Sequence, residues 1–284
     1  MNRCGESAAL SSAALLLGLL ASSEAAAYVD PIFADGYDPF ACSASDNPQP
    51  NVAIATEAGS GGCPDGMVPV DSFCIDRYEA ALIDDSPGNT SAPWSPYFNP
   101  GTTPVHAVSA RFAVPQGYIS QVQAGAACAA AGKRLCTDSE WLRACRGPDA
   151  TTYPFGNDYV AGTCNDTRAV NPVVELHGSD SSQWTFADFN DPCLDQLPQG
   201  LTRAGNWPAC VSAEGVYDLM GNLLEWTADP AGTFRGGDYV NSTINGNGCL
   251  YVTTAHDALY HDYSTGFRCC SDAPPAPMAR AGSR

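Results

Sequence analysis

Gly215-Val-Tyr-Asp-Leu-Met-Gly-Asn-Leu-Leu-Glu-Trp226 combines an oxygen-rich turn with apolar residues on both sides. Val216 and Tyr217 are β-forming residues, which predict the end of a short strand. Gly221-Asn222 are residue types that tolerate a positive φ in a tight turn. Leucine and tryptophan side chains follow at once, so we expect the turn to lie against the core of the domain.

Two carboxylates, Asp218 and Glu225, lie on either side of this turn. Calcium takes about six to eight oxygen ligands, and a turn between two carboxylates can add backbone carbonyl oxygens to them. The alternative is structural: Asp218 hydrogen-bonds to the local backbone, and Glu225 pairs with an arginine. Spacing alone favours the structural interpretation.

The composition indicates one loop-rich globular domain. The chain has 284 residues with 27 glycines and 22 prolines, and only 15% of its residues are charged, which suits a core-forming rather than a disordered chain. Its formal net charge of −18 argues against nucleic acid and against anionic membrane surfaces as partners.

The N-terminus carries the features of a signal peptide over residues 1–27. Arg3 precedes an apolar segment, 13–20, and Ala25-Ala26-Ala27 form a small-residue cleavage site. That apolar segment is too short to span a bilayer, and no later one approaches the ~20 residues that a membrane helix requires. We therefore expect a secreted or periplasmic protein without a membrane span.

The cysteines support export independently. The chain has 13, and removal of Cys4 with the signal peptide leaves an even number, scattered rather than grouped in two CxxC pairs. This pattern favours a disulfide framework over a zinc site. Cys74 is expected to bond to Cys269 or Cys270 if the terminal strands of the domain lie side by side. Neighbouring residues on a strand point to opposite faces, so Cys269 and Cys270 should have different partners.

Local signals divide the chain into an extended polar leader, 28–62, one domain, 63–271, and a flexible C-terminal tail, 272–284. Within the domain, 67–70 and 73–80 alternate and contain β-forming residues, which predicts two short strands.

Two helices are predicted near the middle of the domain. The first begins near Ser120 and ends at Gly132. The second begins at Thr137-Asp-Ser-Glu140, which fits the capping-box pattern. Lys133-Arg134, between them, are interpreted as basic side chains that pair with acidic residues rather than as an anion site. The segment 153–213 is predicted to be nearly all loop, and such long loops are usually functional or disordered.

Several motifs, taken in order, resemble the formylglycine-generating enzyme (sulfatase-modifying factor) domain family. They are Gly66-Met-Val68, Phe73-Cys-Ile-Asp-Arg-Tyr-Glu79, Gly132-Lys-Arg-Leu-Cys-Thr-Asp-Ser-Glu-Trp141, Tyr153-Pro-Phe-Gly-Asn157, the 215–226 stretch, Phe234-Arg-Gly-Gly-Asp238 and Gly266-Phe-Arg-Cys269. The resemblance implies an irregular, loop-rich α+β fold of the C-type-lectin-like kind, with two short helices, a small twisted antiparallel sheet and disulfides. Oxidases, other metalloenzymes and non-catalytic binding modules all share this fold. The resemblance therefore implies less about function than about structure.

The same resemblance implies structural calcium at two places. The first site would use Asn165 and the backbone of Asp166. The ligands of the second would be the side chains of Asp218 and Glu225 and the backbone oxygens of Gly221 and Leu223. With the resemblance included, calcium becomes the favoured interpretation of the turn.

The catalytic cysteines of the family have no counterpart in this chain. In formylglycine-generating enzymes, two cysteines after Arg-Gly-Gly bind copper(I) and activate oxygen to oxidise a substrate cysteine, since soft thiolates suit copper(I). Asn241 and Gly246 stand at those positions. Cys249 lies close by, but the even cysteine count favours a disulfide for it. Neither copper nor formylglycine-generating activity is therefore expected.

A different active site in the same cleft is the alternative. His256 and His261, with Asp257 and Asp262 beside them, form a cluster that could hold a transition metal or supply a general base. With Asp238 and Asn241 as further candidates in the cleft, they would make an oxidoreductase or another metal-dependent enzyme that modifies proteins. The competing interpretation is that both histidines are surface residues in an acidic neighbourhood. We favour a monomeric, catalytically silent protein that binds a peptide, protein, glycan or other envelope ligand through the cleft under residues 235–241.

Overall fold

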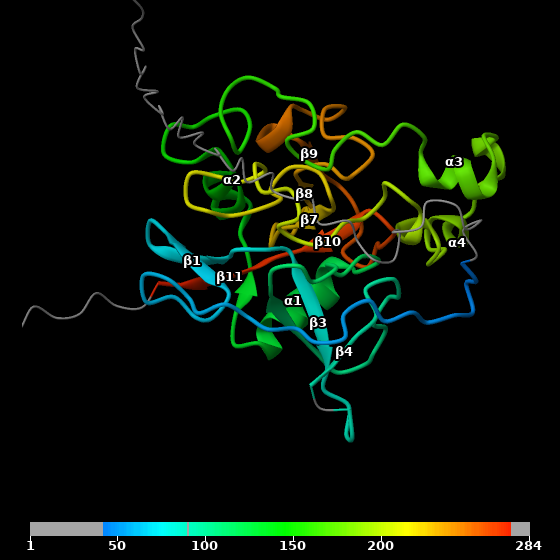
Figure 1. The fold of residues 1–284 in the computed structure, drawn as a ribbon, viewed down its shortest axis with the longest axis horizontal. Helices are drawn as coiled ribbons and strands as arrows, with labels where there is room; N and C mark the ends of the chain where they lie inside the picture. The colour runs from blue at the N-terminus through cyan, green and yellow to red at the C-terminus, as the bar shows by residue number, and fades with distance from the viewer. Residues whose placement is uncertain (1–41, 90, 274–284) are drawn as a thin grey trace, which may run out of the picture. The chain divides into compact units, whose positions relative to one another are not determined.

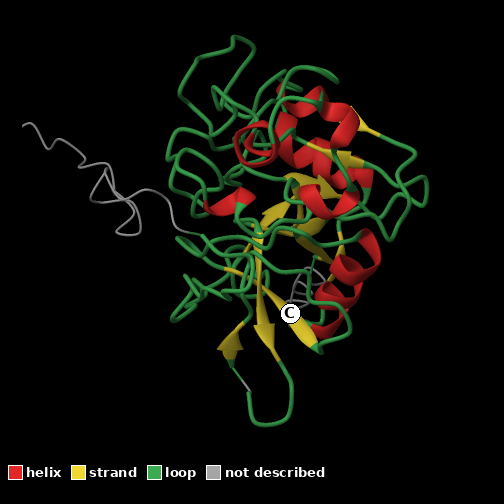
Figure 2. Ribbon diagram, turned by 90° about the vertical axis from the view of Figure 1, so that its right-hand side faces the viewer, coloured by secondary structure: helices red, strands yellow, loops and turns green. Residues whose placement is uncertain are grey.

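The computed structural model describes residues 42–89 and 91–273 (Figure 1). The predicted signal peptide, the first part of the leader and nearly all of the tail lie outside the described residues. Short strands form three small sheets, and loops connect most of the elements (Figure 2). The α+β class predicted from the sequence is confirmed.

The first sheet brings the beginning and the end of the domain together. Its strand order is β1–β2–β11–β6, and β1 (Met67–Val70) forms the predicted hairpin with β2 (Phe73–Asp76). β11 (Cys269–Asp272) runs antiparallel to both of its neighbours, β2 and β6 (Arg134–Leu135). The last strand of the domain therefore lies between residues from its start and its middle.

The second sheet contains the 215–226 stretch. Its strands, in spatial order, are β10 (Thr265–Phe267), β7 (Leu224–Trp226), β8 (Phe234–Arg235) and β9 (Val252–Thr253). β10 and β7 are parallel, whereas the other pairs are antiparallel. The turn at Gly221-Asn222 thus leads directly into a central strand.

The third sheet packs against the first helix. Its central strand β3 (Ala80–Asp84) pairs antiparallel with β4 (Ala92–Pro93) and β5 (Val105–Ser109). The single strand predicted over 73–80 is therefore interrupted, because residues 77–79 leave the first sheet and bend into the third. That bend places a buried glutamate, Glu79, next to the turn at Gly221-Asn222, called the central turn below.

Both predicted helices are present with their predicted caps. α1 (Gln121–Ala130) follows Ser120, and α2 (Asp138–Arg146) follows Thr137, each in a capping box. Such a cap satisfies backbone N–H groups that have no partner within the helix. The basic pair before α2 is paired with acids as expected, with Lys133 Nζ 2.6 Å from an oxygen of Asp76.

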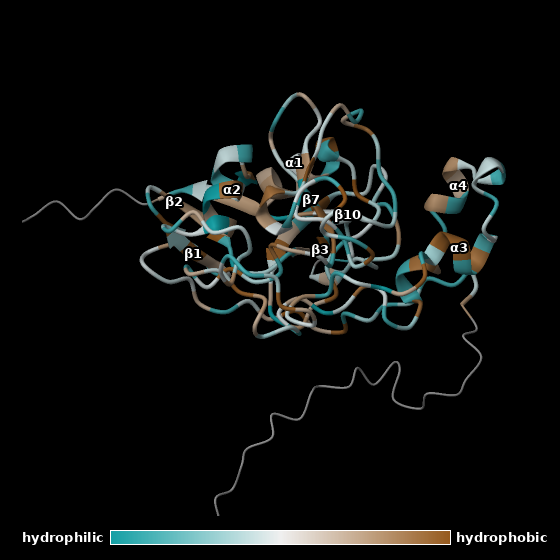
Figure 3. Cartoon of the chain, turned by 90° about the horizontal axis from the view of Figure 1, so that it is seen from above, coloured by the Kyte–Doolittle hydropathy of each residue, from teal (hydrophilic) through white to brown (hydrophobic). Residues whose placement is uncertain are grey.

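The segment predicted as loop over 153–213 contains further helices. These are α3 (Pro172–His177), α4 (Phe186–Phe189) and the short 3-10 helices η2 (Ser181–Gln183) and η3 (Leu194–Gln196); η4 (Gly248–Leu250) lies later in the chain. α3 and α4 contact each other and lie apart from α1 and α2 (Figures 1 and 3). Asn171-Pro172 carried a signal for the first of them, since Asn is a favoured N-cap and Pro a favoured first helical residue.

All the cysteines of the described residues form disulfides. The bonds are Cys42–Cys193, Cys63–Cys74, Cys128–Cys269, Cys136–Cys270, Cys145–Cys249 and Cys164–Cys210. The expected bond from Cys74 to Cys269 or Cys270 is wrong, although their strands are neighbours, because the register places Cys74 opposite Ser271. The different partners of Cys269 and Cys270 are confirmed.

Disulfides on this scale are typical of proteins that fold in an oxidising compartment. Among the described residues, no helix has both the length and the apolar character needed to cross a membrane.

The core consists of several adjoining clusters. Trp226 and Phe267 pack with residues of α1 in one cluster, and Trp141 packs with residues of β1 and β2 in another. Tyr118 and Tyr239 belong to a third, aromatic cluster. The central turn lies where these clusters meet, which is why its carboxylates are buried.

Candidate functional site

Glu225, at the end of the turn, is a fully buried carboxylate paired with Arg268. Arg268 Nη2 lies 2.6 Å from Oε1 and its Nε lies 2.6 Å from Oε2, which makes a two-pronged bond. Trp141 Nε1 also donates to Oε2, at 2.7 Å. The arginine pair that the structural interpretation expected is therefore confirmed, and it comes from the Gly266-Phe-Arg-Cys269 motif.

A second buried carboxylate, Glu79, holds the turn itself. Its Oε2 accepts from Asn222 Nδ2 at 2.5 Å, and its Oε1 accepts from the Leu223 backbone N–H at 3.1 Å. Burial, together with the nearby carboxylates of Asp218 and Glu225, raises the pKa of Glu79 well above its usual range. Asn222 has a φ of 61°, the left-handed conformation that the sequence predicted for this turn.

Asp218 ties the turn to the preceding loop. Its Oδ2 accepts from the Gly205 backbone N–H at 2.6 Å, which differs from the local backbone bond that the structural interpretation expected. Burial raises the pKa of Asp218 to about 7. Asp218 and Glu79 thus lie within electrostatic reach of the buried Arg268 guanidinium, which hydrogen-bonds to Glu225. These three carboxylates could therefore attract a further cation.

The residues of the two predicted calcium sites lie next to each other. A Cβ atom on Gly221 would come within 2.1 Å of the Asn165 carbonyl oxygen, so only glycine fits there. The same oxygen accepts from the Asn222 N–H at 2.7 Å. On the neighbouring residue, Asp166, Oδ2 accepts from Ser242 Oγ at 2.8 Å while the buried Oδ1 has no hydrogen-bond partner.

These residues offer oxygen chemistry that fits calcium, but without a dense set of acidic ligands. Glu225 Oε1 accepts only one hydrogen bond and keeps a lone pair, while Arg268 already balances the charge of this carboxylate. Over residues 42–89 and 91–273, no group of three or more histidine, cysteine, aspartate or glutamate side chains could hold a metal ion. Calcium here would depend on backbone oxygens such as those of Gly221 and Leu223, and it stays a prediction.

The positions of the family's catalytic cysteines are structural in this chain. Cys249, the nearest cysteine in sequence to Asn241 and Gly246, is bonded to Cys145. Gly246 has a φ of 118°, and a Cβ atom there would lie 2.4 Å from the Leu250 carbonyl oxygen. A cysteine side chain at position 246 would therefore collide with the backbone that follows it.

Most of the segment 235–242 is buried, whereas Val240 and Asn241 are partly exposed. Tyr239 is 0% exposed, and its carbonyl accepts from the Arg168 N–H at 2.9 Å. Ser242 is 1% exposed and is bonded to Asp166. Two residues of the 153–213 segment, Asp166 and Arg168, thus contact the segment beneath which a ligand cleft is predicted.

The two histidines lie in one aromatic cluster, in which His256 packs on Tyr260, Tyr260 on Phe186, and Phe186 on His261. The ring of His256 packs on Phe234, with centroids 4.7 Å apart, whereas His261 Nδ1 lies 2.7 Å from Asn190 Oδ1. Asp238 accepts from the backbone N–H groups of its own turn, including that of Asn241. Among the described residues, no hydrogen bond or ion pair joins any two of His256, His261 and Asp238.

Asp238 should make stability depend on pH, because burial raises its pKa to about 7. The carboxyl group is protonated more readily in the folded than in the unfolded chain, so its contribution is fully present below about pH 4 and is lost as the pH rises to about 7. Asp238→Asn keeps an oxygen for the Val240 and Asn241 N–H groups and removes the charge.

We expect Asp238→Asn to be more stable than the wild type by about 1–3 kcal/mol at pH 8 and equally stable at pH 4. Urea unfolding at both pH values measures the difference. An equal effect at pH 4 and pH 8 would contradict a charge-based origin.

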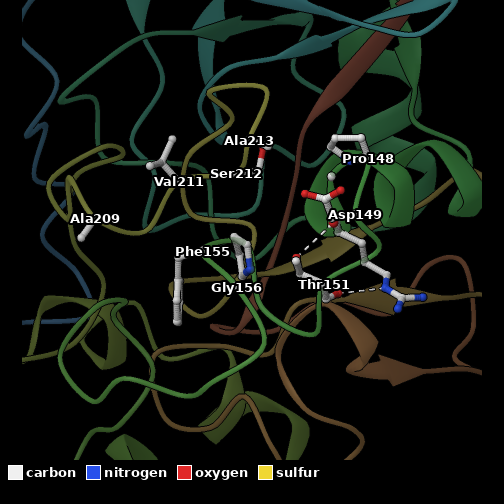
Figure 4. Close-up of a pocket in the computed structure, with 12 residues that line it drawn as sticks. Pro148, Asp149, Thr151, Phe155, Gly156, Ala209, Val211, Ser212 and Ala213 are labelled. Carbon is white, nitrogen blue, oxygen red and sulfur yellow. Dashed lines mark hydrogen bonds between the residues drawn. The ribbon is translucent and has the colours of Figure 1, made fainter.

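Cavities lie elsewhere on the domain. One of about 470 Å³ opens at the end of α2, with walls that include Pro148, Phe155 and Val211 (Figure 4). A second, of about 340 Å³, lies beside α1, and a third, of about 300 Å³, is lined mainly by charged and tyrosine side chains. Residues 235–246 line none of these three.

Comparison with known proteins connects this geometry to a family. The model of the sulfatase-modifying factor enzyme 1-like domain matches residues 54–273. The chain belongs to this family. The match begins within the segment predicted as a polar leader, and it confirms the resemblance drawn from the motifs.

Relatives in the sulfatase-modifying factor family include inactive and active proteins. Inactive C-alpha-formylglycine-generating enzyme 2 of Mus musculus is 30% identical over 181 residues, covering 60% of this chain and 53% of that protein. Formylglycine-generating enzyme of Thermomonospora curvata is 29% identical over 153 residues, covering 52% and 44%. The chain spans about half the length of these curated relatives. Among solved structures, PvdO from Pseudomonas aeruginosa aligns over 78% of this chain and 98% of its own, with 15% identity and a TM-score of 0.44.

Two residues of the buried network were missed as functional candidates although their motifs were noted. Glu79 ends one family motif and Arg268 lies within another. Buried charged side chains are costly unless paired, so an arginine between apolar residues of the Gly266-Phe-Arg-Cys269 motif and a glutamate directly before the apolar strand 80–83 were the available signal. Spacing could not show that both converge on Gly215–Trp226.

Proposed function

We propose that this protein is a catalytically silent member of the sulfatase-modifying factor family that binds a ligand outside the cytoplasm. The observation that carries the proposal is the replacement of the copper-binding cysteines by Asn241 and Gly246, with Cys249 held in a disulfide. Neither an amide nor a glycine can replace a thiolate as a copper(I) ligand. The inactive mouse relative offers a precedent for loss of activity within the family.

The test is conversion of a sulfatase-derived cysteine peptide in the presence of copper(I) and oxygen. We expect no formylglycine by mass spectrometry, and no retained copper after desalting. The formylglycine-generating enzyme of Thermomonospora curvata, assayed in parallel, provides the positive control. Conversion of the peptide by this protein at a rate within a hundredfold of the control would reject the proposal.

An enzyme with a different residue set remains the second candidate. It would need Asp238, His256 and His261 in one accessible site. Asp238 lies in a buried turn, and the two histidines are connected through the rings of Tyr260 and Phe186 rather than through a polar contact. The burial of Asp238 in its own turn supports the binding role over this candidate.

We also propose that calcium binds beside the turn through Asp218, Glu225 and backbone oxygens. The support is the surplus of buried carboxylates over the single guanidinium of Arg268. A cation present at about a hundred times its dissociation constant adds about 2.7 kcal/mol of stability, which corresponds to about 5–10 °C in melting temperature for a domain of this size.

Removal of calcium with EDTA should therefore lower the melting temperature by about 5–10 °C, and calcium but not magnesium should restore it. Asp218→Asn should abolish this response, whereas Asp149→Asn, at an exposed position, should retain it. Elemental analysis of the purified protein gives the stoichiometry. A melting temperature that EDTA leaves unchanged, with no bound calcium, would mean that Arg268 alone balances the network.

A further inference from the structure

A small polar pocket lies apart from the Arg235–Gly246 segment. It has a volume of about 300 Å³, and the residues that line it come from the leader, the end of β2, the turn after β5 and the Gly215 turn. The side chains that matter for its chemistry are those of Glu57, Arg77, Tyr78, Arg111, Glu214 and Tyr217. Val68 is the one aliphatic side chain of appreciable size in its lining.

The charges of this pocket cancel. Arg77 Nη1 pairs with Glu57 Oε2 at 2.5 Å, and Glu214 Oε1 pairs with Arg143 outside the pocket at 2.5 Å. Among the described residues, no carboxylate pairs with Arg111, whose side chain is exposed at the rim. Two guanidinium groups and two carboxylates therefore offer both donors and acceptors without a net charge, which suits a neutral ligand better than an ion.

The tyrosines give the pocket an aromatic wall. Tyr78 and Tyr217 are stacked, with ring centroids 5.2 Å apart, and Tyr217 is half-buried. Tyr78 donates to Glu57 Oε1 at 3.3 Å, and burial raises the pKa of its hydroxyl to about 12, so it stays a donor. Gly205 lies so close to the Tyr78 ring that a Cβ atom would come within 2.7 Å of it.

The exposed arginine is also held in place. Arg111 Cζ lies 4.7 Å from the centroid of the Phe112 ring. Phe112 has a φ of 63°, an unusual conformation for a bulky residue, and such outliers are maintained only where the surrounding structure enforces them. The Arg111 side chain therefore leaves a turn of defined backbone conformation and packs on the ring of its neighbour.

We propose that this pocket binds a neutral sugar residue of a glycan. Each hydroxyl of a sugar both donates and accepts hydrogen bonds, so it matches a lining that mixes arginine and glutamate, and the apolar face of the ring can pack on a tyrosine. The inference rests on the proposed binding function and specifies its ligand class. The larger cavity of Figure 4 has mainly apolar walls, so it matches a sugar less well.

The experiment uses the full exported chain and a panel of methyl glycosides of neutral hexoses and N-acetylhexosamines, with methyl glucuronide as the charged counterpart. Binding is measured by ligand-observed NMR and calorimetry. Arg111→Ala and Glu57→Gln should each weaken binding of a neutral glycoside about tenfold. Arg111→Ala removes a charged donor, and Glu57→Gln replaces a charged acceptor with a weaker, neutral one. Asp149→Ala, in the larger cavity, is the matched control and should bind normally.

Three outcomes would overturn the inference: no binding of any neutral glycoside, preference for the glucuronide, or loss of binding in Asp149→Ala instead of the two pocket variants. Unchanged melting temperatures establish that the variants are folded. The peptide-conversion assay is independent of these results, so failure of the sugar site and failure of the silent-protein proposal are distinguishable.

Discussion

Replacing Arg268 with methionine is expected to destabilise the domain by about 3–5 kcal/mol, because it leaves the buried carboxylate of Glu225 without its counter-charge. The variant also loses the bonds that Arg268 donates to the carbonyl oxygens of Asp76 and Tyr217. Guanidinium unfolding of the oxidised protein measures the change. The effect should be among the largest of any single substitution outside the disulfides.

The double variant Glu225→Gln with Arg268→Met removes both charges and serves as the control. Its loss of stability should be smaller than the sum of the two single losses, because no unpaired charge remains buried. Arg134→Met removes a partly exposed ion pair with Glu140 and should cost only about 0–1 kcal/mol. Simple additivity in the double variant would show that the pair is not coupled.

Removing the Cys145–Cys249 bond by a double substitution to alanine is expected to cost about 4 kcal/mol, because it links residues 104 positions apart. The bond restricts the unfolded chain over a long loop, and both cysteines are fully buried. Guanidinium unfolding with the other disulfides intact measures the loss. The double alanine variant of Cys63–Cys74, which closes a loop of 11 residues, should lose less.

The single variant Cys145→Ala tests whether Cys249 has a role beyond this disulfide. It should expose one titratable thiol, at Cys249, and still convert no cysteine peptide. Formylglycine formation by this variant would mean that Cys249 can act as a catalytic thiol once released. The absence of activity would place Cys249 firmly among the structural cysteines, in line with the silent-protein proposal.

Much of the fold follows from signals that are local in the sequence. Ser120 and Thr137 cap the two main helices as predicted, because a side chain and the N–H groups that it caps lie within one turn of chain. The Gly221-Asn222 turn also has its predicted left-handed conformation. The sequence also shows that Asn241 and Gly246 replace the catalytic cysteines, because this depends only on which residues stand at given positions of a recognisable motif.

Other features depend on contacts between residues far apart in the chain. Cys74 was expected to bond to a cysteine of the last strand, and the strands do pair, but the register decides which side chains meet, and it sets Cys74 opposite Ser271. The helices α3 and α4 were missed within 153–213 because their short lengths give little periodicity, so their stability comes from packing rather than from propensity.

The sequence by itself determined the family, the disulfide-rich α+β class and the absence of the cysteine pair. Each of these depends only on the types of residues in short segments and on the order of those segments. Only the tertiary structure decided that Glu79 and Arg268 contact the Gly215–Trp226 turn, that Asp166 and Arg168 contact the 235–242 segment, and that Arg111 and Tyr217 share a pocket. These arrangements depend on how separate segments pack and register against one another, and no local pattern in the chain specifies that geometry.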